Sequence, residues 1–561
     1  MKIRCLPLIL LIISTTRAAS LCDDLDAAPS DQHTGNTPVV LVSQDGGPVA
    51  GRYPPNPFSP DVSNPNGSYG PSMSYVYGMM PRIVVKTGES APQKTENYAH
   101  YEPNPVQRVS DVPVSTFSID VDSGSYSNVR RMIAREGRLP PADAVRTEEI
   151  LNYFNYDYPP PQDGKPFAVH TQTVDSPWKA DAKLIRIAIQ AADLAPEKRP
   201  PANLVFLIDT SGSMDDPDKL PLVKKTVCHF AEALRADDRI TLIAFSDDVR
   251  ELLPPTFGDQ KEKIVAALKP LRPHGMAAGA DALHLAYQAV REHYQEDGIN
   301  RILLASDGDF NRGISNLELR WYIGDQRGNH IGLTILGFGT GNYNDALLET
   351  LADKADNGSY HYIDSEAEAK KVLVRQLTPT LTTIARDVKI RVEFNPETVK
   401  EYRLVGYENR LLHEDYYDND DENAGDIGAG GSVTALYAIT PQEKPYWGVA
   451  SRYQQPLAGD KANEYGWLNL RYKDADDGER QPLEQPVMAS SIPLEDADAS
   501  TRLAIAAASY AQALKDSEQN GALDWAGILR LAQSAKGEDP HGERAGLIAL
   551  IEKAQSLSAG K

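Results

Sequence analysis

Three oxygen-bearing side chains follow a short apolar run near the middle of the chain. Residues 204–208 are all apolar, and Asp209, Ser211 and Ser213 follow at alternate positions within "LVFLIDTSGSM". Carboxylates and hydroxyls are hard oxygen donors of the kind that bind Mg²⁺ or Mn²⁺. The pattern is therefore compatible with a helix N-cap, a catalytic aspartate or a metal-binding cup, and the surrounding elements must decide among these.

The segment that carries these residues alternates between strand and helix patterns. Short strands joined by helical crossovers predict a mostly parallel sheet covered on both faces, which is a doubly wound α/β fold. In such sheets ligands bind beyond the carboxyl ends of the strands, where the winding direction switches. We expect strands at 203–209, 239–245, 300–306, 331–337 and 360–363, and helices near 218–235, 279–295, 315–327 and 342–355.

A second acidic turn falls at the same predicted edge. Asp307 stands directly after a strand, within "SDGDFN". A magnesium ion takes six oxygens and keeps some waters. A cup with two serine hydroxyls and few directly bound carboxylates would leave the ion short of electrons, so it would seek a carboxylate from a partner protein.

Asp209-x-Ser211-x-Ser213 with Asp307 resembles the metal-ion-dependent adhesion site of von Willebrand factor type A (VWA) domains. The resemblance implies that Ser211 and Ser213 bind Mg²⁺ or Mn²⁺ directly, while Asp209 and Asp307 act largely through water. An Asp or Glu of a protein partner would then supply the final ligand. It also implies a non-enzymatic binding protein.

More narrowly, the chain resembles a bacterial exported subfamily, the YfbK-like proteins, over roughly residues 108 to 558. The stretches that carry this resemblance are "PVSTFSIDVDSGSYSNVRR" and "EEILNYFNYDYPPP" before the α/β region, and "YRLVGYENR", "GDIGAGGSVTALYAI" and "KGEDPHGERAGLIALI" after it.

One position departs from the VWA pattern. The family has a threonine ligand in a loop before the helix that precedes the "SDG" strand, and here that loop reads "RPHGMAAGADALHLAY". Aligning Gly275 places Met276 and Ala277 where Ser and Thr are expected, so Ala277 supplies no ligand. His274 and Asp281 are nearby, and we expect them to be polar residues of the surface rather than metal ligands. The departure motivates an alternative, a structural or assembly protein of the envelope with a vestigial metal site.

The sequence offers little support for a catalytic function. A haloacid-dehalogenase-type phosphatase needs a second Asp where Ser211 stands, so general acid–base catalysis lacks its group. The "GFGTGN" stretch at 337–342 does not have the G-x-G-x-x-G spacing, and no Gly-x-Ser-x-Gly elbow occurs. A metal-assisted hydrolase is kept only as a third class, and we expect no enzyme.

Two other acidic stretches could suggest calcium. The run from Asp120 would need a Glu at loop position twelve, where Arg131 stands. The stretch 415–428 is dense in carboxylates, but a solvated turn between strands explains it at least as well.

Composition narrows the class of partner. The chain of 561 residues has a formal net charge of -22, with 41% hydrophobic and 24% charged residues. These are the proportions of a soluble globular protein. The negative charge argues against a nucleic-acid partner and against electrostatic docking to an anionic membrane.

The N-terminus has the layout of a secretory signal over 1–20. Lys2 and Arg4 precede an apolar run that is too short to span a bilayer, and small residues follow. "AASLC" resembles a lipoprotein box apart from Leu21, which predicts possible lipidation of Cys22. We therefore expect an exported protein of the periplasm or cell surface, touching the membrane only through such an anchor. Cys228 is expected as a buried apolar residue, and no disulfide framework is visible.

The rest of the chain divides by composition and periodicity. We expect a disordered Pro/Gly/Ser/Asn-rich tether at 21–108, an N-terminal α+β region at 109–198 and the VWA-like domain at 199–380. A C-terminal region at 381–561 is expected to be β-rich and then helical from about 496.

Overall fold

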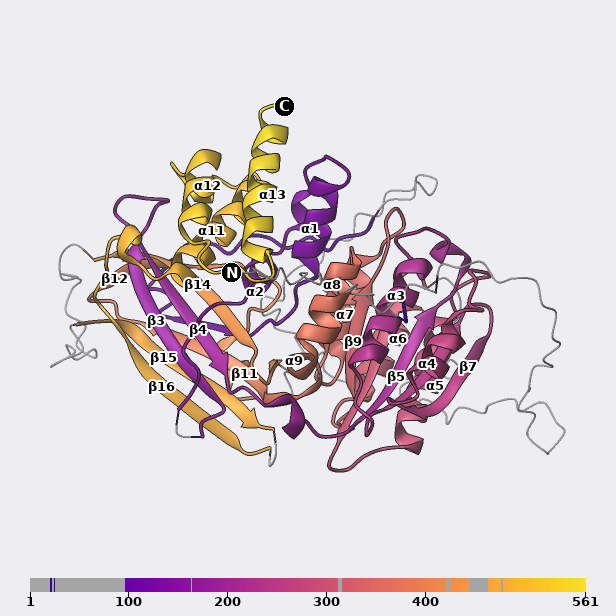
Figure 1. Ribbon diagram of the computed structural model, residues 1–561. Helices are drawn as coiled ribbons and strands as arrows, with labels where there is room; N and C mark the ends of the chain where they lie inside the picture. Colours follow the sequence, from indigo (N-terminus) through magenta and orange to yellow (C-terminus); the bar gives the residue numbers. More distant parts are fainter. Residues whose placement is uncertain are drawn as a thin grey trace, which may run out of the picture. The chain divides into compact units, whose positions relative to one another are not determined.

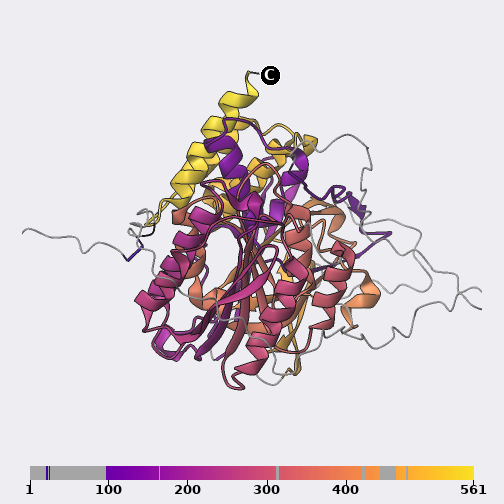
Figure 2. The same cartoon turned by 90° about the vertical axis from the view of Figure 1, so that its right-hand side faces the viewer.

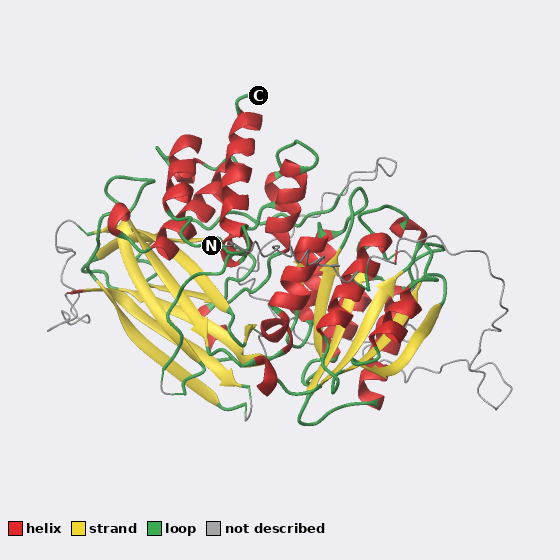
Figure 3. Cartoon of the chain, viewed as in Figure 1, coloured by secondary structure: helices red, strands yellow, loops and turns green. Residues whose placement is uncertain are grey.

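The structure is a computed structural model that describes residues 21, 22, 25, 96–162, 164–310, 315–419, 424–442, 463–475 and 478–560. The chain divides into two compact units, and all the described residues belong to the unit formed by 1–25 and 81–561. Figure 1 shows the chain in ribbon form, and Figure 3 separates its two strand-rich regions.

A six-stranded sheet lies at the centre of the α/β region, in the order β10-β9-β8-β5-β6-β7. The pairs β5–β6, β5–β8, β8–β9 and β9–β10 are parallel, whereas the edge strand β7 runs antiparallel to β6. The winding direction switches at β5, between β6 and β8. The strands are β5 (Ala202–Asp209), β6 (Arg239–Phe245), β7 (Val249–Phe257), β8 (Ile299–Ser306), β9 (Gly332–Gly337) and β10 (Ser359–Tyr362).

Helices cover both faces of this sheet (Figures 1 and 2). Successive strand residues point to opposite faces, so Leu204 and Phe206 of β5 pack in one apolar cluster and Val205 and Leu207 in the other. The first cluster includes α3 (Leu220–Ala233), α4 (Lys261–Leu268) and the segment after α8 (Glu366–Lys370). The second includes α5 (Gly279–Glu292), α6 (Asn316–Asp325) and α7 (Asp345–Lys354).

The doubly wound α/β fold predicted from the sequence is confirmed, with five strands and four helices within three residues of their expected bounds. Strand β7 and helix α4 were not predicted. β7 contains Pro254 and Pro255, which cannot donate to a ladder and are tolerated because this strand lies at the sheet edge.

A second region consists of two antiparallel sheets around a shared apolar core. One sheet has the order β1-β12-β14-β4-β3, and the other has β13-β11-β15-β16 with β2 also paired to β11. Their strands are β1 (Gln107–Arg108), β2 (Val114–Ser118), β3 (Phe167–Asp175), β4 (Lys183–Ala191), β11 (Thr383–Phe394), β12 (Val399–Val405), β13 (Gly425–Gly428), β14 (Ser432–Pro441), β15 (Glu464–Asp474) and β16 (Arg480–Met488).

These pairings revise the division into separate N-terminal and C-terminal regions. β4 from the segment before the α/β domain pairs along its length with β14 from the segment after it, and β2 pairs with β11. The two segments therefore share both sheets, and the α/β domain is inserted between them.

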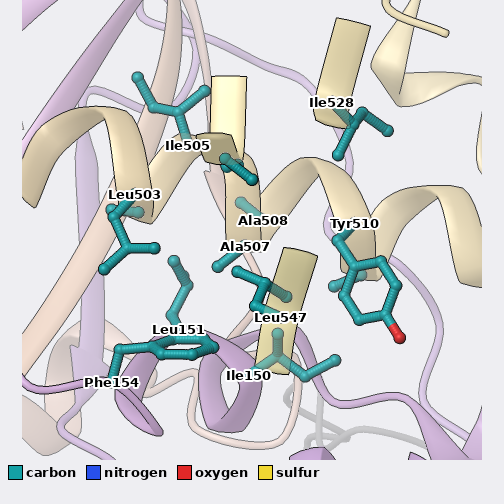
Figure 4. Packing of buried hydrophobic residues seen from close by; sticks show 14 of the residues in the cluster. Ile150, Leu151, Phe154, Leu503, Ile505, Ala507, Ala508, Tyr510, Ile528 and Leu547 are labelled. Atoms are coloured by element: carbon teal, nitrogen blue, oxygen red, sulfur yellow. The ribbon is translucent and has the colours of Figure 1, made fainter. Parts of the chain in front are cut away.

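Helices from both ends of the chain also share one core. Ile150 and Leu151 of α2 pack with Leu503 of α11, Ile528 of α12 and Leu547 of α13 (Figure 4). These helices are α1 (Gly124–Ala134), α2 (Thr147–Asn152), α11 (Ala499–Leu514), α12 (Trp525–Ser534) and α13 (Glu543–Ser558); α9 (Leu377–Leu381) and α10 (Glu414–Tyr417) are short. The helical structure expected from about residue 496 is thus present.

The expected tether at 21–108 is too long at its C-terminal end. Asn97 forms a bridge with Asn344, and the buried Asn104 side chain donates to the carbonyls of Leu404 and Gly406 at 3.2 and 2.7 Å. Residues from 96 onward are therefore part of the fold. The predicted signal at 1–20 and the tether residues 26–95 lie outside the described residues.

Cys22 and Cys228 form a disulfide, which corrects two expectations. A sulfur bonded to another sulfur cannot carry the thioether-linked lipid of a lipoprotein, so the expected lipidation of Cys22 conflicts with the structure. Cys228 on α3 is buried as expected, but it is the second half of this cross-link. Among the described residues, no helix combines the length and the hydropathy needed to cross a membrane.

Candidate metal site at the carboxyl edge of the sheet

The two acidic turns meet at the carboxyl edge of the six-stranded sheet. Asp209 is the last residue of β5, and Asp307 directly follows β8, which pairs with β5 in parallel. The Ser306 hydroxyl donates to Asp209 Oδ2 at 2.7 Å, which joins the two turns. Both carboxylates are fully buried. They lie at the switch point of a doubly wound sheet, which is where ligands bind in such folds.

Two serine hydroxyls, in the turn that follows Asp209, form the rim of the candidate cup. Asp209 Oδ1 accepts from the backbone N–H of Ser211 at 2.9 Å, which fixes the turn. The hydroxyl oxygens of Ser211 and Ser213 lie 3.0 Å apart. Adjacent oxygens on an octahedral ion with bonds of about 2.1 Å are separated by about 3 Å. The serine pair therefore has the spacing that Mg²⁺ or Mn²⁺ needs.

The Asp209 carboxyl lacks compensating positive charge. Burial, and then the nearby charge of Asp307, raise its pKa to about 7, against the lowering effect of hydrogen bonds from Ser306 and Ser211. A carboxylate that is buried beside another carboxylate favours a cation or a proton. The chemistry of this part of the donor set fits a divalent cation.

The Asp307 carboxylate, by contrast, is already well satisfied. Its Oδ2 accepts from the Lys219 ammonium at 3.1 Å and from the Asn342 side-chain amide at 3.0 Å, and its Oδ1 accepts from the backbone N–H of Asp309 at 3.0 Å. Sequence reasoning missed Lys219, Asn342 and Ser306. Ser306 is adjacent to Asp307 and could have been found, whereas the other two come from distant loops with no local signal.

The loop that should carry the threonine offers no ligand from its side chain. Ala277 is fully buried in the apolar cluster on the α5 face of the sheet. His274 instead hydrogen-bonds the Ser246 hydroxyl at 2.9 Å, and the Met276 backbone N–H donates to Asp247 at 3.1 Å. Asp281 lies in the exposed first turn of α5. The loop is thus held by the turn after β6, and it meets the cup through its backbone, because the Gly275 carbonyl accepts from the Gly212 N–H at 2.9 Å.

The other acidic stretches do not form metal sites in the described residues. Asp120 and Asp122 face the Arg410 guanidinium at 3.3 and 3.0 Å, which offsets part of their negative charge. Arg131, at the twelfth position, pairs with Glu96 at 3.0 Å. Residues 420–423 of the third acidic stretch lie outside the described residues.

One further group of ligand-type atoms exists elsewhere on the α/β domain. Atoms of Cys22, His229 and Glu232 lie within 4.8 Å of one another. The Cys22 sulfur is committed to the disulfide, so it is not free to act as a thiolate ligand.

The parallel sheet with its oxygen cup at the switch point defines the class of this protein. Residues 203–376 match the von Willebrand factor type A domain family, residues 92–186 match a von Willebrand factor family, and residues 379–557 match the C-terminal family of the uncharacterized protein YfbK. The chain is 41% identical over 476 residues to the uncharacterized protein YfbK of Escherichia coli (strain K12), covering 83% of this chain and 82% of that one. It therefore belongs to the YfbK family of VWA proteins.

The chain is also similar to more distant proteins. The uncharacterized protein sll0103 of Synechocystis sp. is 30% identical over 217 residues, which is 38% of this chain and 49% of the relative. Among solved structures, a von Willebrand factor type A protein from Catenulispora acidiphila covers 71% of this chain and 98% of its own, at 18% identity and a TM-score of 0.39.

Proposed function

We propose that this protein is a non-enzymatic binding protein of the bacterial cell envelope, whose VWA domain engages a carboxylate of a partner protein through a metal-ion-dependent adhesion site. One observation carries the proposal: two serine hydroxyls that hydrogen-bond each other at 3.0 Å follow the fully buried Asp209 in one turn, beside the strand that precedes the fully buried Asp307. Ser213 is half-buried and Gly212 is exposed, so the cup opens to solvent.

The residues of the candidate site would bind the ion in two different ways. Ser211 and Ser213 would hold Mg²⁺ or Mn²⁺ directly, and Asp209 and Asp307 would act largely through water. When bound, the ion would supply an open coordination position for an Asp or Glu oxygen of the partner. The backbone N–H of Gly212 donates to the Gly275 carbonyl at 2.9 Å and steadies the rim.

Nothing in the cup favours catalysis. His274 hydrogen-bonds Ser246 rather than Ser211 or Ser213, so among the described residues these two serine hydroxyls have no histidine partner. Position 211 is a serine where a phosphatase of the haloacid-dehalogenase type needs its acid–base carboxylate. These features support binding over turnover.

Two features support an envelope location. The first twenty residues have the composition of a secretory signal. The Cys22–Cys228 disulfide suits an oxidising compartment such as the periplasm or the cell surface.

A second candidate function is a structural or assembly role that needs no metal. It is favoured by Ala277, which removes one ligand, and by Lys219, whose ammonium is already bound to Asp307. In this case the protein would bind its partners through other surfaces.

Calorimetric titration of Mg²⁺, then Mn²⁺, into the metal-stripped mature protein tests the proposal. We expect saturable binding that falls at least about tenfold in Asp209→Ala, because the substitution removes a buried carboxylate from the set of oxygen donors. Asp281→Ala is the matched control, since it removes an exposed carboxylate of the same domain. A library of peptides bearing Asp or Glu should then bind with the metal and not with a chelator. Absence of metal binding in the wild-type protein would favour the second candidate.

A further inference from the structure

Lys219 is a buried cation within the site. It stands at the N-cap of α3, and its side chain is 2% exposed. The ammonium donates to the Ser213 carbonyl at 2.9 Å, to Asp307 Oδ2 at 3.1 Å and to Asn342 Oδ1 at 2.6 Å. A lysine ammonium has three N–H donors, so all three are satisfied, and two of the acceptors belong to the residues that make the cup.

The neighbouring loop is shaped to hold this lysine. Gly339 has a φ of +83°, and a Cβ atom there would lie 2.3 Å from Lys219 Cε. Any other residue at 339 would therefore displace the lysine side chain. Asn342, three residues on, accepts from Lys219 through Oδ1 and donates to Asp307 and Asp309 through Nδ2 at 3.0 Å each.

The charge of the site follows from these contacts. Asp209 and Asp307 carry two formal negative charges, and Lys219 fixes one positive charge 3.1 Å from Asp307. A divalent cation in the cup would be repelled by this ammonium in a buried, low-dielectric environment. It would also find Asp307 Oδ2 already accepting two hydrogen bonds.

We propose that Lys219 is an internal counter-ion of this adhesion site, which holds Asp307 in place without metal and lowers the affinity of the cup for divalent cations. This inference rests on the proposed function. Lys219 and Ala277 then act in the same direction, one by occupying a carboxylate and the other by lacking a hydroxyl. The site would take its metal weakly, and a partner carboxylate would be needed to retain it.

Replacement of the lysine by a neutral residue of similar length tests this. In Lys219→Met we expect Mg²⁺ and Mn²⁺ to bind at least about tenfold more tightly than in the wild-type protein, because a repelling charge is lost and Asp307 is freed. Lys225→Met is the control, since it makes the same change on the same helix at a lysine paired with Glu366 at 3.1 Å. Its metal affinity should stay at the wild-type value.

A purely structural ion pair predicts a different result. Loss of a structural lysine would lower the melting temperature and leave metal affinity unchanged or reduced, and that outcome in a folded Lys219→Met protein overturns the proposal. If this variant folds only with millimolar Mg²⁺, the proposal is supported, because the metal then replaces the ammonium. Lys219→Gln keeps a hydrogen-bond donor and serves as the second variant. Failure of both to fold with Mg²⁺ present also overturns the proposal.

These outcomes are separable from the fate of the proposed function. Tighter metal binding in Lys219→Met, with no carboxylate peptide bound by any variant, would keep the inference and reject adhesion. Metal-dependent peptide binding in the wild-type protein, with no gain in metal affinity in Lys219→Met, would keep adhesion and reject the inference.

Discussion

At the scale of single residues, the two aspartates of the cup have different roles because their hydrogen-bond partners differ. Asp209 accepts hydrogen bonds from neutral groups of Ser211 and Ser306, and its pKa is raised to about 7 by burial and by Asp307. Asp307 accepts three, one of them from an ammonium. Asp209 is thus the carboxylate with an unmet need for positive charge, and we expect it to be the more sensitive position for metal binding.

Restoring the missing hydroxyl should strengthen the site. We expect Ala277→Thr to raise Mg²⁺ affinity at least about tenfold, because a hard oxygen ligand is added where the VWA pattern has one. Ala277 is fully buried among apolar residues, so the larger side chain should also cost about 1–3 kcal/mol of stability.

Calorimetry and thermal melting measure the two effects of this substitution. Ala278→Thr is the matched control, since Ala278 is also buried and immediately precedes α5. An Ala277→Thr protein that stays folded but binds metal no better would show that this loop does not face the cup.

The sequence predicted the parts of the site that are adjacent along the chain. Asp209, Ser211 and Ser213 form one short motif, and Asp307 follows a recognisable strand. Lys219 and Asn342 reach the site only through the crossover geometry of α3 and the loop after β9. Their side chains carry no local pattern, so only the three-dimensional structure could reveal the internal cation.

At the scale of elements, local periodicity predicted the α/β domain and failed for the sandwich pairing. The region from 381 was expected to be β-rich, and β11 and β14 lie there. Which strand pairs with which is decided by contacts between residues more than 200 positions apart, as in the ladder between β4 and β14. Alternation of apolar residues determines the face of a strand but not its partner.

The Cys22–Cys228 disulfide is the other element-scale feature that could not be predicted. The two cysteines are separated by 206 residues, and no spacing pattern links them. The cross-link places the N-terminal segment against α3, where Cys22, Cys228 and Val265 form a small apolar cluster. Asn97 pairs with Asn344, so Cys22 and Asn97 each contact the VWA domain.

Breaking this cross-link should destabilise the α/β domain measurably. We expect Cys22→Ser to lower the free energy of unfolding by about 2–4 kcal/mol, because a long loop of the unfolded chain is no longer closed. Chemical denaturation of the wild-type and variant proteins under non-reducing conditions measures the difference. Peptide mapping by mass spectrometry without reductant should find the two cysteines in one cross-linked fragment. A lipid mass on Cys22 would contradict the structure.

At the scale of the whole folded unit, buried charges link the VWA domain to the elements around it. Arg146, just before α2, pairs with Asp345 at 2.5 Å and with Glu349 at 3.3 Å, both on α7. Arg410, which follows β12, likewise pairs with Asp122, which precedes α1. Removing one member of such a buried pair leaves an uncompensated charge, so these contacts make the relative placement of the joined elements sensitive to ionisation.

The buried carboxyl of Glu148 predicts how the stability of the protein changes with pH. The α2 residue is buried, its Oε2 accepts from the backbone N–H of Tyr407 at 2.8 Å, and burial followed by the charge of Glu408 raises its pKa from 4.5 to about 8. Between these two values the folded protein binds more protons than the unfolded one. The free energy of unfolding should therefore fall as pH rises from about 4.5 to about 8.

Glu148→Gln isolates that contribution, because an amide oxygen can still accept from Tyr407 while the charge is removed. We expect the variant to melt at a higher temperature than the wild-type protein at pH 8 and to lose part of the downward slope between pH 5 and pH 8. Glu393→Gln, at an exposed position of β11, should leave both unchanged. A Glu148→Gln protein that is no more stable than the wild-type protein at pH 8 would contradict this prediction. It would mean that the ionised Glu148 carboxylate does not destabilise the fold, and that the shared helical core alone determines how stably the two ends of the chain associate.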